Sequence, residues 1–408
     1  MAPGSCPFVS RATRALALAL GVSLAVGTPG SAQTRADDIA RQQEEKAQTA
    51  KPDQVTRAEA FFEQLEQGKW FVGQPRGWYP VFGSIYPGGG FAPGGGYRHH
   101  IGYDSYVDVS AMYSLTRYKQ VQISGSTPNH AHDRLDLAGS ISWLDAPRVP
   151  FYGLGNESEQ DDGTNFRISR SRMEGAATLH LVDWLRLRLD GGIDDYAQKP
   201  GQGATPSIET AFTPDTAPLL GQHLRYLRGE ASAAIVWLQS PGYSRTGGLY
   251  RFAYEEFNPV NRAGGTFGFA RTELVQHVPI LRETWVLSLR ARTESIVRKS
   301  DVVPYFLMPW LGSGTTLRGY GTGRFRDRHS LLLGSEVRWF PNRLGLDMAL
   351  FFDAGKVAPQ RSQLTLDGMQ TDYGIGVRFH TPSATALRFD LARGHEGWRT
   401  VLAASAPF

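Results

Sequence analysis

The sequence has almost no cysteine, since Cys6 is the only one among 408 residues. It precedes an apolar segment near the N-terminus, where it is not placed like a lipid-attachment cysteine. The remaining chain therefore excludes disulfides, zinc–thiolate sites and a cysteine nucleophile.

A strong excess of one charge sign is also lacking. The formal net charge is +4, and removal of Arg11 and Arg14 with the N-terminal segment would lower it to +2. Basicity therefore gives no argument for a nucleic-acid partner or for anionic lipid.

Long apolar runs are rare as well. The run ALALALGVSLAV (15–26) follows Arg11 and Arg14 and precedes the small residues SAQ (31–33), which predicts an export signal over residues 1–32. An uncleaved anchor is the alternative, although the run is too short for a membrane-spanning helix. An exported chain of this composition is either a soluble periplasmic protein or a membrane β-barrel.

Alternation of apolar and polar side chains favours the barrel. In DYGIGVRFH (372–380), Tyr373 and Ile375 share one parity, and Asp372 and Arg378 share the other. Side chains alternate across a strand, so one face is apolar and the other polar. Strands of soluble sandwiches are about 5–6 residues long. The alternating runs here reach about ten residues, as a tilted membrane strand requires.

Sixteen such runs are predicted, which indicates an all-β fold: a transmembrane antiparallel β-barrel of about 16 strands over residues 78–408. The runs are 78–86, 90–99, 104–114, 117–126, 135–145, 165–181, 184–195, 222–238, 245–257, 264–277, 283–298, 329–340, 345–354, 371–380, 384–393 and 398–408. Long connections follow the odd runs and mostly short ones follow the even runs. Bacterial barrels have short periplasmic turns and long external loops, so this parity predicts a periplasmic N-terminus.

Aromatic residues near the ends of runs are expected to form an interfacial girdle, with Trp237, Phe340 and Trp398 as its members.

The polar parity is predicted to face a water-filled lumen, because sixteen strands leave an aqueous interior. Its charged members are Arg186, Arg188, Arg228, Arg290, Arg292, Arg338, Arg378, Arg388, Asp190, Asp194, Glu230, Glu294, Glu336, Asp353, Asp372 and Asp390. The two signs roughly balance, which favours internal ion pairing over a strongly ion-selective pore.

Four motifs resemble the BamA/TamA family of outer-membrane assembly barrels, also called bacterial surface antigens. They are PFYGLGNES (150–158), LRGY (317–320), SEVRWF (335–340) and ALFFDAGKV (349–357). The resemblance covers about 78–408. It implies that the long external loop 299–328 folds back into the lumen.

The same resemblance implies a tether in the lumen. In the family, the loop arginine is held by acidic residues of the next two strands, which here means Arg318 with Glu336 and Asp353. A guanidinium presents a planar fork that suits two carboxylates. Gly319 permits a tight backbone, and Tyr320 is expected to pack against the wall. An exposed loop arginine is the alternative.

Two further sites are predicted at the ends of the barrel. Phe408 resembles the terminal aromatic of family barrels, which implies an assembly signal. Pro80 in the first run and Pro407 in the last weaken the lateral seam where these runs meet, because proline cannot donate a ladder hydrogen bond. The alternative is a sharp bend that only serves closure.

Residues 33–77 are too few for the periplasmic domains that usually precede the family's barrel. Val55, Ala58, Phe62 and Leu65 lie on one helical stripe, so this short N-terminal periplasmic segment is predicted to be partly helical. It would sit in the periplasmic mouth, dock a partner or form a loose leader.

Other chemistry is weakly supported. NHAHD (129–133) groups His130, His132 and Asp133, but a solvated periplasmic turn is favoured over a metal site. There is no G-x-S-x-G motif. No catalytic residue, metal or cofactor is predicted, and no enzyme activity is expected.

The sequence therefore predicts a barrel of the bacterial outer membrane that assists insertion or translocation of protein or lipid. A passive channel or surface antigen is the alternative, and an outer-membrane enzyme is a third class. Expected partners are outer-membrane lipid and periplasmic or outer-membrane assembly proteins. The sequence does not indicate the client or the oligomeric state.

Overall fold

The computed structural model describes residues 75–406 except 103, 241–242, 262, 282–283, 299–301, 342–344, 381–384 and 404–405. The predicted export signal, the stripe of Val55 to Leu65, Pro407 and Phe408 lie outside the described residues.

Sixteen strands form one sheet in which each strand pairs antiparallel with the next along the chain, apart from a short hairpin inside one loop. They are β1 (Gly77–Gly83), β2 (Ala92–Ile101), β3 (Ser105–Tyr113), β4 (Lys119–Asn129), β5 (Leu135–Phe151), β6 (Thr164–Val182), β7 (Leu185–Pro200), β8 (Leu224–Val236), β9 (Gly247–Pro259), β10 (Phe267–Leu281), β11 (Trp285–Arg298), β14 (His329–Trp339), β15 (Leu346–Ala358), β16 (Gln370–His380), β17 (Thr385–Gly394) and β18 (Gly397–Ala403). The inserted hairpin consists of β12 (Trp310–Leu311) and β13 (Phe325–Arg326).

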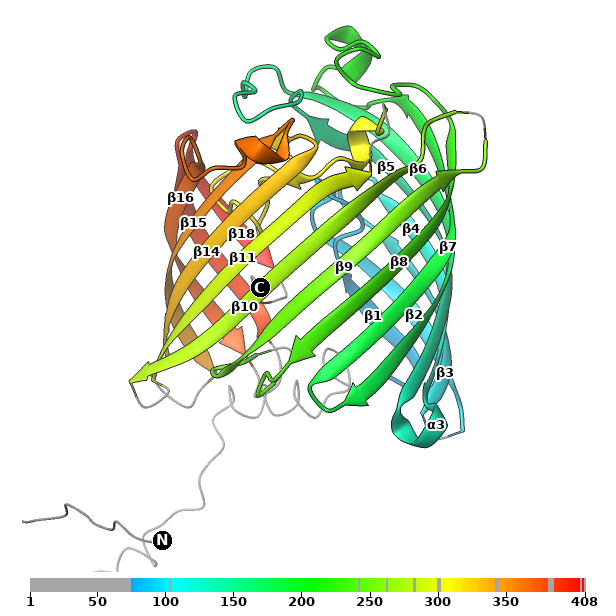
Figure 1. Ribbon diagram of the computed structural model, residues 1–408, viewed down its shortest axis with the longest axis vertical. Coiled ribbons are helices and arrows are strands. Elements are labelled where there is room, and N and C mark those ends of the chain that lie inside the picture. Colours follow the sequence, from blue (N-terminus) through cyan, green and yellow to red (C-terminus); the bar gives the residue numbers. More distant parts are fainter. Residues whose placement is uncertain are drawn as a thin grey trace, which may run out of the picture. The chain divides into compact units, whose positions relative to one another are not determined.

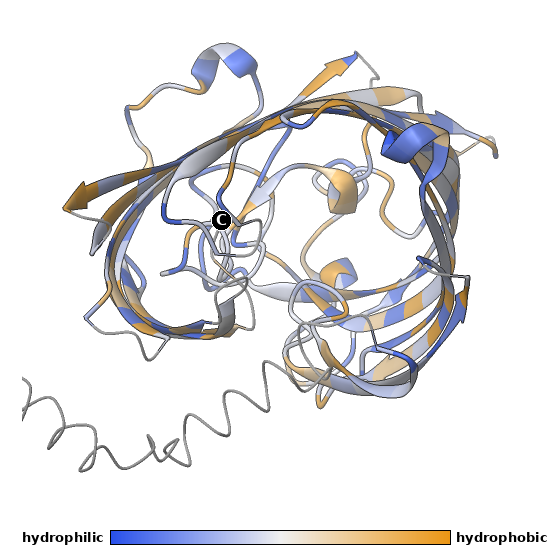
Figure 2. Ribbon diagram, turned by 90° about the horizontal axis from the view of Figure 1, so that it is seen from below, coloured by the Kyte–Doolittle hydropathy of each residue, from blue (hydrophilic) through white to orange (hydrophobic). Residues whose placement is uncertain are grey.

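The sheet curls into a barrel of tilted strands (Figures 1 and 2). This confirms the predicted antiparallel barrel of sixteen strands. All sixteen predicted runs correspond to strands in the same order, and their bounds differ by only a few residues at most ends.

The outer face of the barrel is apolar. Large side chains of one parity are exposed along the strands, among them Val121, Ile123, Ile141, Leu187, Leu189, Ile193, Leu289, Leu350, Phe352, Ile375, Leu387 and Phe389. In Figure 2 the strands are banded by hydropathy along their length. An apolar band of this kind faces hydrocarbon in a membrane barrel.

The two ends of the barrel differ. Long connections gather at the upper end in Figure 1, and most connections at the other end are short. The helical turns η1 (Ile208–Thr210), η2 (Tyr305–Leu307) and η3 (Arg361–Gln363) belong to the long connections, and α3 (His130–Asp133) is one of the short turns. Within the described part of the chain, no helix is long and apolar enough to cross a membrane.

The largest buried core lies among the long connections and the strand ends next to them. We call it the aromatic cap; its central members are Phe151, Phe166, Tyr226, Phe257, Phe267, Phe269, Tyr305 and Phe306. Tyr305 packs edge-to-face against Phe151 and Phe166, with ring centroids 5.1 and 4.9 Å away. It thereby joins the loop after β11 to the loop-side ends of β5 and β6. Packed rings thus join the long connections to the strand ends by side-chain contacts, as in a protein interior.

Two sequence predictions need correction. The predicted run 135–145 ended before Pro150 and Phe151, which would place them in the external loop that follows, but they form the end of β5. Phe340 was assigned to the girdle, but it is buried beside Tyr243 and Val286. The reason is its parity, which it shares with Glu336 and Arg338 and which points into the lumen.

The predicted girdle member Trp237 is exposed at the short-turn end, together with tryptophans that the prediction did not include. Trp184, Trp237, Trp285 and Trp339 are exposed near the short turns, and the rings of Trp285 and Trp339 stack at 5.8 Å. Trp398 is exposed at the opposite end, at the start of β18.

Candidate functional site

The loop after β11 enters the barrel and carries the candidate site. We call its described part, residues 302–328, the tether loop. β12 and β13 pair through Trp310 and Arg326, and the LRGY segment (317–320) lies between these two short strands. The hairpin therefore holds LRGY in its connecting loop, which faces the wall formed by β14 to β18.

Arg318 lies between the two acids that the resemblance implied. Its Nη1 donates to Glu336 Oε2 at 2.8 Å, and its Nε donates to Asp353 Oδ2 at 2.7 Å. A second bond joins Nη2 to Asp353 Oδ1 at 3.2 Å, so the contact with Asp353 is bidentate. Glu336 comes from β14 and Asp353 from β15. The guanidinium group therefore donates hydrogen bonds to two neighbouring strands at once.

The site is almost fully buried. Arg318 is 1% exposed, and its guanidinium carbon lies 3.4 Å from the centroid of the Phe351 ring. Burial by itself would lower the pKa of Arg318, but the charges of Asp353 and Glu336 outweigh it and raise that pKa. The arginine therefore stays charged, and its partners remain necessary because an unpaired buried charge is strongly unfavourable.

Other arginines complete the site. Arg378 donates from Nη2 to Glu336 Oε2 at 2.7 Å and lies 3.3 Å from Asp390. Arg388 donates to the carbonyl of Gly314 at 2.6 Å, and Arg290 donates to the carbonyl of Thr315 at 2.7 Å. The last two contacts hold the backbone of the tether loop rather than its side chains.

The sequence predicted lumen-facing positions and internal ion pairing for Arg378, Arg388, Arg290 and Asp390, but it linked none of them to the tether loop. Their alternation placed them on the correct face, whereas their contacts with the tether loop depend on the path of that loop. Asp372 faces Asp353 across the β15–β16 ladder and is buried in the same cluster.

Position 319 must be glycine because the loop backbone lies too close to the barrel wall for a side chain. A Cβ at this position would lie 2.6 Å from the backbone nitrogen of Gly394 and 2.7 Å from Cβ of Asp372. Real Cβ atoms do not approach backbone so closely. Only glycine therefore lets the loop backbone touch β16 and β17 here.

Tyr320 and Leu317 anchor the two sides of Arg318. The hydroxyl of Tyr320 donates to the carbonyl of Thr371 at 3.1 Å and accepts from the backbone N–H of His395 at 3.3 Å. Leu317 is fully buried in a small apolar cluster whose other members are Leu311, Tyr320, Phe325, Leu332 and Val357. The charged contact is thus enclosed by apolar packing.

The second family motif, PFYGLGNES, contacts the tether loop and its wall. The N–H of Gly155 donates to the carbonyl of Arg326 at 2.8 Å. Asn156 accepts from the N–H of Val357 at 3.2 Å and donates to the carbonyl of Gly368 at 3.0 Å. The sequence marked this motif but could not assign Asn156 its partners, which lie more than 200 residues away.

The same motif also receives a side chain from the tether loop. Arg324 donates to Ser158 Oγ at 2.8 Å and to Glu396 at 2.5 Å. Arg324 is buried, and its guanidinium lies 5.1 Å from the Tyr152 ring. The loop after β5, the tether loop and the β17–β18 turn therefore meet at one arginine.

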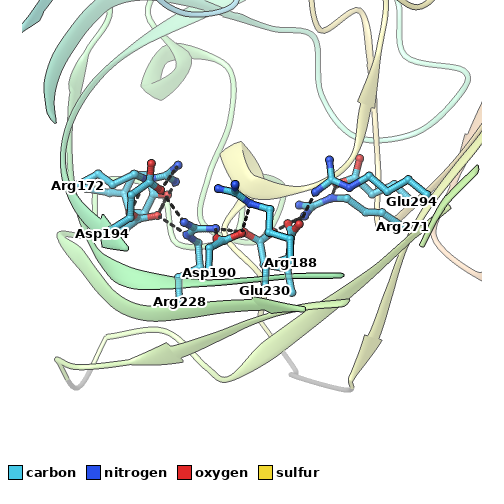
Figure 3. A network of polar contacts seen from close by, with 12 residues as sticks. Arg172, Arg188, Asp190, Asp194, Arg228, Glu230, Arg271 and Glu294 are labelled. Atoms are coloured by element: carbon cyan, nitrogen blue, oxygen red, sulfur yellow. Dashed lines mark hydrogen bonds and ion pairs between the residues drawn. The ribbon is translucent and has the colours of Figure 1, made fainter. Parts of the chain in front are cut away.

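A different part of the lumen wall carries a belt of ion pairs. Arg172 pairs with Asp194 at 2.6 Å, Arg228 with Asp190 at 2.9 Å, and Arg271 with Glu294 at 2.7 Å. Figure 3 shows these side chains joined along the strands from β6 to β11. The belt consists of Arg172, Arg188, Arg228, Arg251, Arg271, Arg292, Glu174, Asp190, Asp194, Glu230, Glu255 and Glu294. Equal numbers of both signs cancel the long-range field of this wall.

The predicted seam lies at the two ends of the sheet order. β1 and β18 are the end strands, and among the described residues no ladder joins them. Pro80 lies in β1 opposite Gly95 of β2, whose neighbours Gly94 and Gly96 also face β1. Pro407 and Phe408 lie outside the described residues, so this seam is described only on the β1 side and up to Ala403 of β18.

The NHAHD stretch forms the turn between β4 and β5. Ala131, His132 and Asp133 all have positive φ, as does Asn129 before them, so the turn is left-handed. In the described ranges no group of three or more His, Cys, Asp or Glu side chains is arranged to hold a metal ion.

Comparisons with known proteins agree with this geometry. A family model described as "Omp85 superfamily domain" matches residues 101–396. No curated protein sequence matches the chain.

Several solved structures have a similar fold. One is BamA from Haemophilus ducreyi in a crystal structure lacking POTRA domains 1-3, with 13% identity, a TM-score of 0.60, and coverage of 81% of this chain and 71% of that chain. CdiB from Acinetobacter baumannii is 12% identical with a TM-score of 0.51, covering 80% of this chain and 58% of that one. CdiB from Escherichia coli is 10% identical with a TM-score of 0.51, covering 80% and 60%. The chain thus spans less than two thirds of the CdiB chains, and at these identities the likeness concerns the fold.

Proposed function

This chain belongs to the Omp85 superfamily of outer-membrane β-barrels, and from that premise we propose that it assists the insertion or translocation of protein or lipid at the outer membrane. The observation that carries the proposal is the pair of short strands at the two ends of the sheet order. We assign no catalytic residue and no cofactor to this activity.

The end strands are weak closing partners. β1 and β18 have seven residues each, whereas their neighbours β2 and β17 have ten. β1 faces three successive glycines of β2, which contribute no side chains to cross-strand packing. Pro80 offers no N–H to either side. These features favour opening of the wall at this seam, where an exposed strand edge would accept a client strand.

The interior supports a route along the wall over a route through the lumen. The aromatic cap packs among the long connections at one end, and the tether loop lies in the lumen against β14 to β18. A client that crossed the lumen would have to displace both. A client that added at the seam would need neither to move.

We place the long-loop end outside the cell and the N-terminus of the barrel in the periplasm. The argument rests on the general asymmetry of bacterial barrels, which have short periplasmic turns and long external loops. β1 begins, and β18 ends, at the short-turn end, so a periplasmic partner would meet both end strands there.

A disulfide across the seam tests the proposal. Val81→Cys and Ala403→Cys, with neighbouring positions scanned for register, would lock β1 to β18 on oxidation. The probe is an unfolded eight-stranded outer-membrane barrel added to liposomes of outer-membrane lipid that contain this protein. We expect faster folding of the probe with the reduced protein than with empty liposomes, and loss of this acceleration on oxidation.

Each single-cysteine variant serves as the matched control, because oxidation should leave it active. An acceleration that persists in the locked double variant would overturn the seam as the route. No acceleration by the unmodified protein would overturn insertion of protein clients. Transfer of fluorescent lipid between liposome populations would then test whether the barrel translocates lipid.

Conductance separates this function from that of a passive channel. With the aromatic cap and the tether loop in place, we expect small and flickering currents in planar bilayers. Large, steady steps from the unmodified protein would favour the passive-channel alternative. Proteins that co-purify with the chain from outer membranes would identify the assembly partners that this proposal implies.

A further inference from the structure

The connection between β8 and β9 folds into the lumen from the short-turn end. The N–H of Trp237 donates to the carbonyl of Gly248 at 3.0 Å, and the N–H of Gln239 donates to that of Thr246 at 3.4 Å, so the hairpin continues beyond its strands. Gly247 has φ 98°, and a Cβ there would lie 2.1 Å from the carbonyl oxygen of Trp237. The bend at the base of this hairpin therefore requires glycine. We call the described residues of this connection, 239–240 and 243–246, the β8–β9 tip.

The β8–β9 tip inserts Tyr243 into the opposite wall. The Tyr243 hydroxyl donates to Asp347 Oδ2 at 2.6 Å, and its ring stacks on His380 with centroids 3.7 Å apart. The ring also meets Phe340 edge-to-face at 6.0 Å. Tyr243 is 5% exposed, although it belongs to a turn. A buried tyrosine with a satisfied hydroxyl is a specific anchor.

The backbone and the second side chain of the tip are held as well. Arg338 donates to the carbonyl of Ser244 at 2.6 Å and also to Ser288 Oγ at 3.0 Å. The guanidinium of Arg245 lies 4.4 Å from the Phe340 ring centroid. Ser288 belongs to β11, Arg338 belongs to β14, and Phe340 directly follows β14. The tip therefore crosses part of the short-turn mouth, because β10, β11 and β14 separate β9 from β15 in the sheet.

The anchor of the β8–β9 tip is continuous with the site that holds the tether loop. Asp347, the partner of Tyr243, is the register partner of Arg378 on the adjacent strand. Arg378 donates to Glu336 Oε2 at 2.7 Å, and Glu336 accepts from Arg318 through the same oxygen. Arg338, which holds Ser244, lies two residues after Glu336 on the same face of β14. One row of buried charges thus runs between the two inward segments.

We propose that the β8–β9 tip is a second lock on the barrel, energetically coupled to the tether loop through Asp347, Arg378 and Glu336. Release of Tyr243 at the short-turn end removes a partner of Asp347. The unsatisfied carboxylate of Asp347 then attracts Arg378 away from Glu336. This shift weakens the contact by which Glu336 holds Arg318. Anything that enters the short-turn mouth and displaces Tyr243 therefore weakens the tether farther along the same wall, on β14 and β15. The coupling does not depend on which client the barrel handles.

The test reports on the tether loop while the change is made in the β8–β9 tip. In a Cys6→Ser background, Thr315→Cys places a thiol on the exposed part of the tether loop near Arg318. The measurement is the rate at which a maleimide labels this thiol in the folded protein. We expect Tyr243→Ala to raise the rate about fivefold or more, as coupled sites typically respond. Arg318→Ala is the positive control, and Tyr373→Ala, on the exposed outer face, is the matched aromatic control.

Tyr243→Phe keeps the ring and removes only the bond to Asp347, so it serves if the alanine variant fails to assemble. Its labelling rate should lie between those of the unmodified protein and Tyr243→Ala. An unchanged rate in both Tyr243 variants, alongside a raised rate in Arg318→Ala, would overturn the coupling. A raised rate in Tyr373→Ala as large as that in Tyr243→Ala would also overturn it, because the effect would then reflect general loosening of the barrel.

Discussion

Glu336 Oε2 accepts hydrogen bonds from Arg318 at 2.8 Å and from Arg378 at 2.7 Å. One carboxylate oxygen thus serves an arginine of the tether loop and an arginine of the barrel wall. Neither arginine can move without changing the environment of the other. The tether is therefore part of the wall's own charge network, and not a loop resting against it.

Arg318→Ala should release the tether loop and lower the stability of the barrel without preventing its insertion. Asp353 and Glu336 would be left buried with fewer partners, and breaking such a pair costs about 3–5 kcal/mol. The measurement is the temperature at which the folded form disappears on a semi-native gel. Arg361→Ala, at an exposed position, is the control and should leave that temperature unchanged.

Arg318 and Asp353 should also be coupled. In a double-mutant cycle of Arg318→Ala and Asp353→Asn in urea unfolding, the interaction term should exceed about 0.5 kcal/mol, because the residues belong to one network. Strictly additive effects would contradict the tether.

Gly319→Ala should displace the tether loop although it adds only a methyl group. The new Cβ would contact the backbone of Gly394 at 2.6 Å, and backbone cannot give way cheaply. Gly321→Ala is the matched control, since its Cβ would be 3.3 Å from the flexible end of Tyr152. Maleimide labelling of Thr315→Cys should rise in the first variant and not in the second. Equal rates in the two variants would contradict the close approach.

Tyr305→Ala should weaken the aromatic cap. The ring packs edge-to-face on Phe151, Phe166 and Phe306, and loss of a buried aromatic side chain costs about 3–5 kcal/mol. In planar bilayers we expect larger and longer current steps than those of the unmodified protein. Leu366→Ala, at an exposed loop position, should conduct like the unmodified protein. Unchanged currents in Tyr305→Ala would show that the cap does not limit conduction.

Asn156→Ala should detach the loop after β5 from β15. The buried N–H of Val357 would lose its acceptor, and an unsatisfied buried donor costs about 1–3 kcal/mol. Protease cleavage within residues 152–163 should become faster in the folded protein. Gln160→Ala, an exposed change in the same loop, is the control, and similar cleavage of both variants would argue against an anchoring role for Asn156.

Deletion of Phe408 should reduce assembly in cells. The terminal aromatic resembles the signal of family barrels, and the other residues of its parity in the last run include Ala404 and Ala406, which are small. The amount of heat-modifiable protein in outer membranes measures assembly. Replacement of Phe408 by tyrosine should preserve it, whereas normal levels after deletion would exclude this residue as a signal.

The alternation of side chains determined the strand order and the lumen face before any tertiary contact was considered. Each sheet strand pairs with the next one along the chain, apart from the inserted hairpin, so the ladder depends on runs such as 329–340 and 345–354 that can be found locally. The same parity placed Arg378 and Asp390 inside. The placement of Arg318 between Glu336 and Asp353 needed the resemblance as well, because alternation says nothing about where a loop goes.

Only the tertiary structure decided how the connections fold inward. Tyr243 meets Asp347 across 104 residues, and Asn156 meets Val357 across 201, so no periodicity within a strand could reveal either pair. Phe340 was assigned to the membrane girdle because it is aromatic and lies at the end of a run, yet the β8–β9 tip covers it. Strand pairing follows from a repeating backbone pattern, whereas docking of a turn or loop depends on a few specific side chains and on glycines, such as Gly247 and Gly319, that allow the backbone to approach.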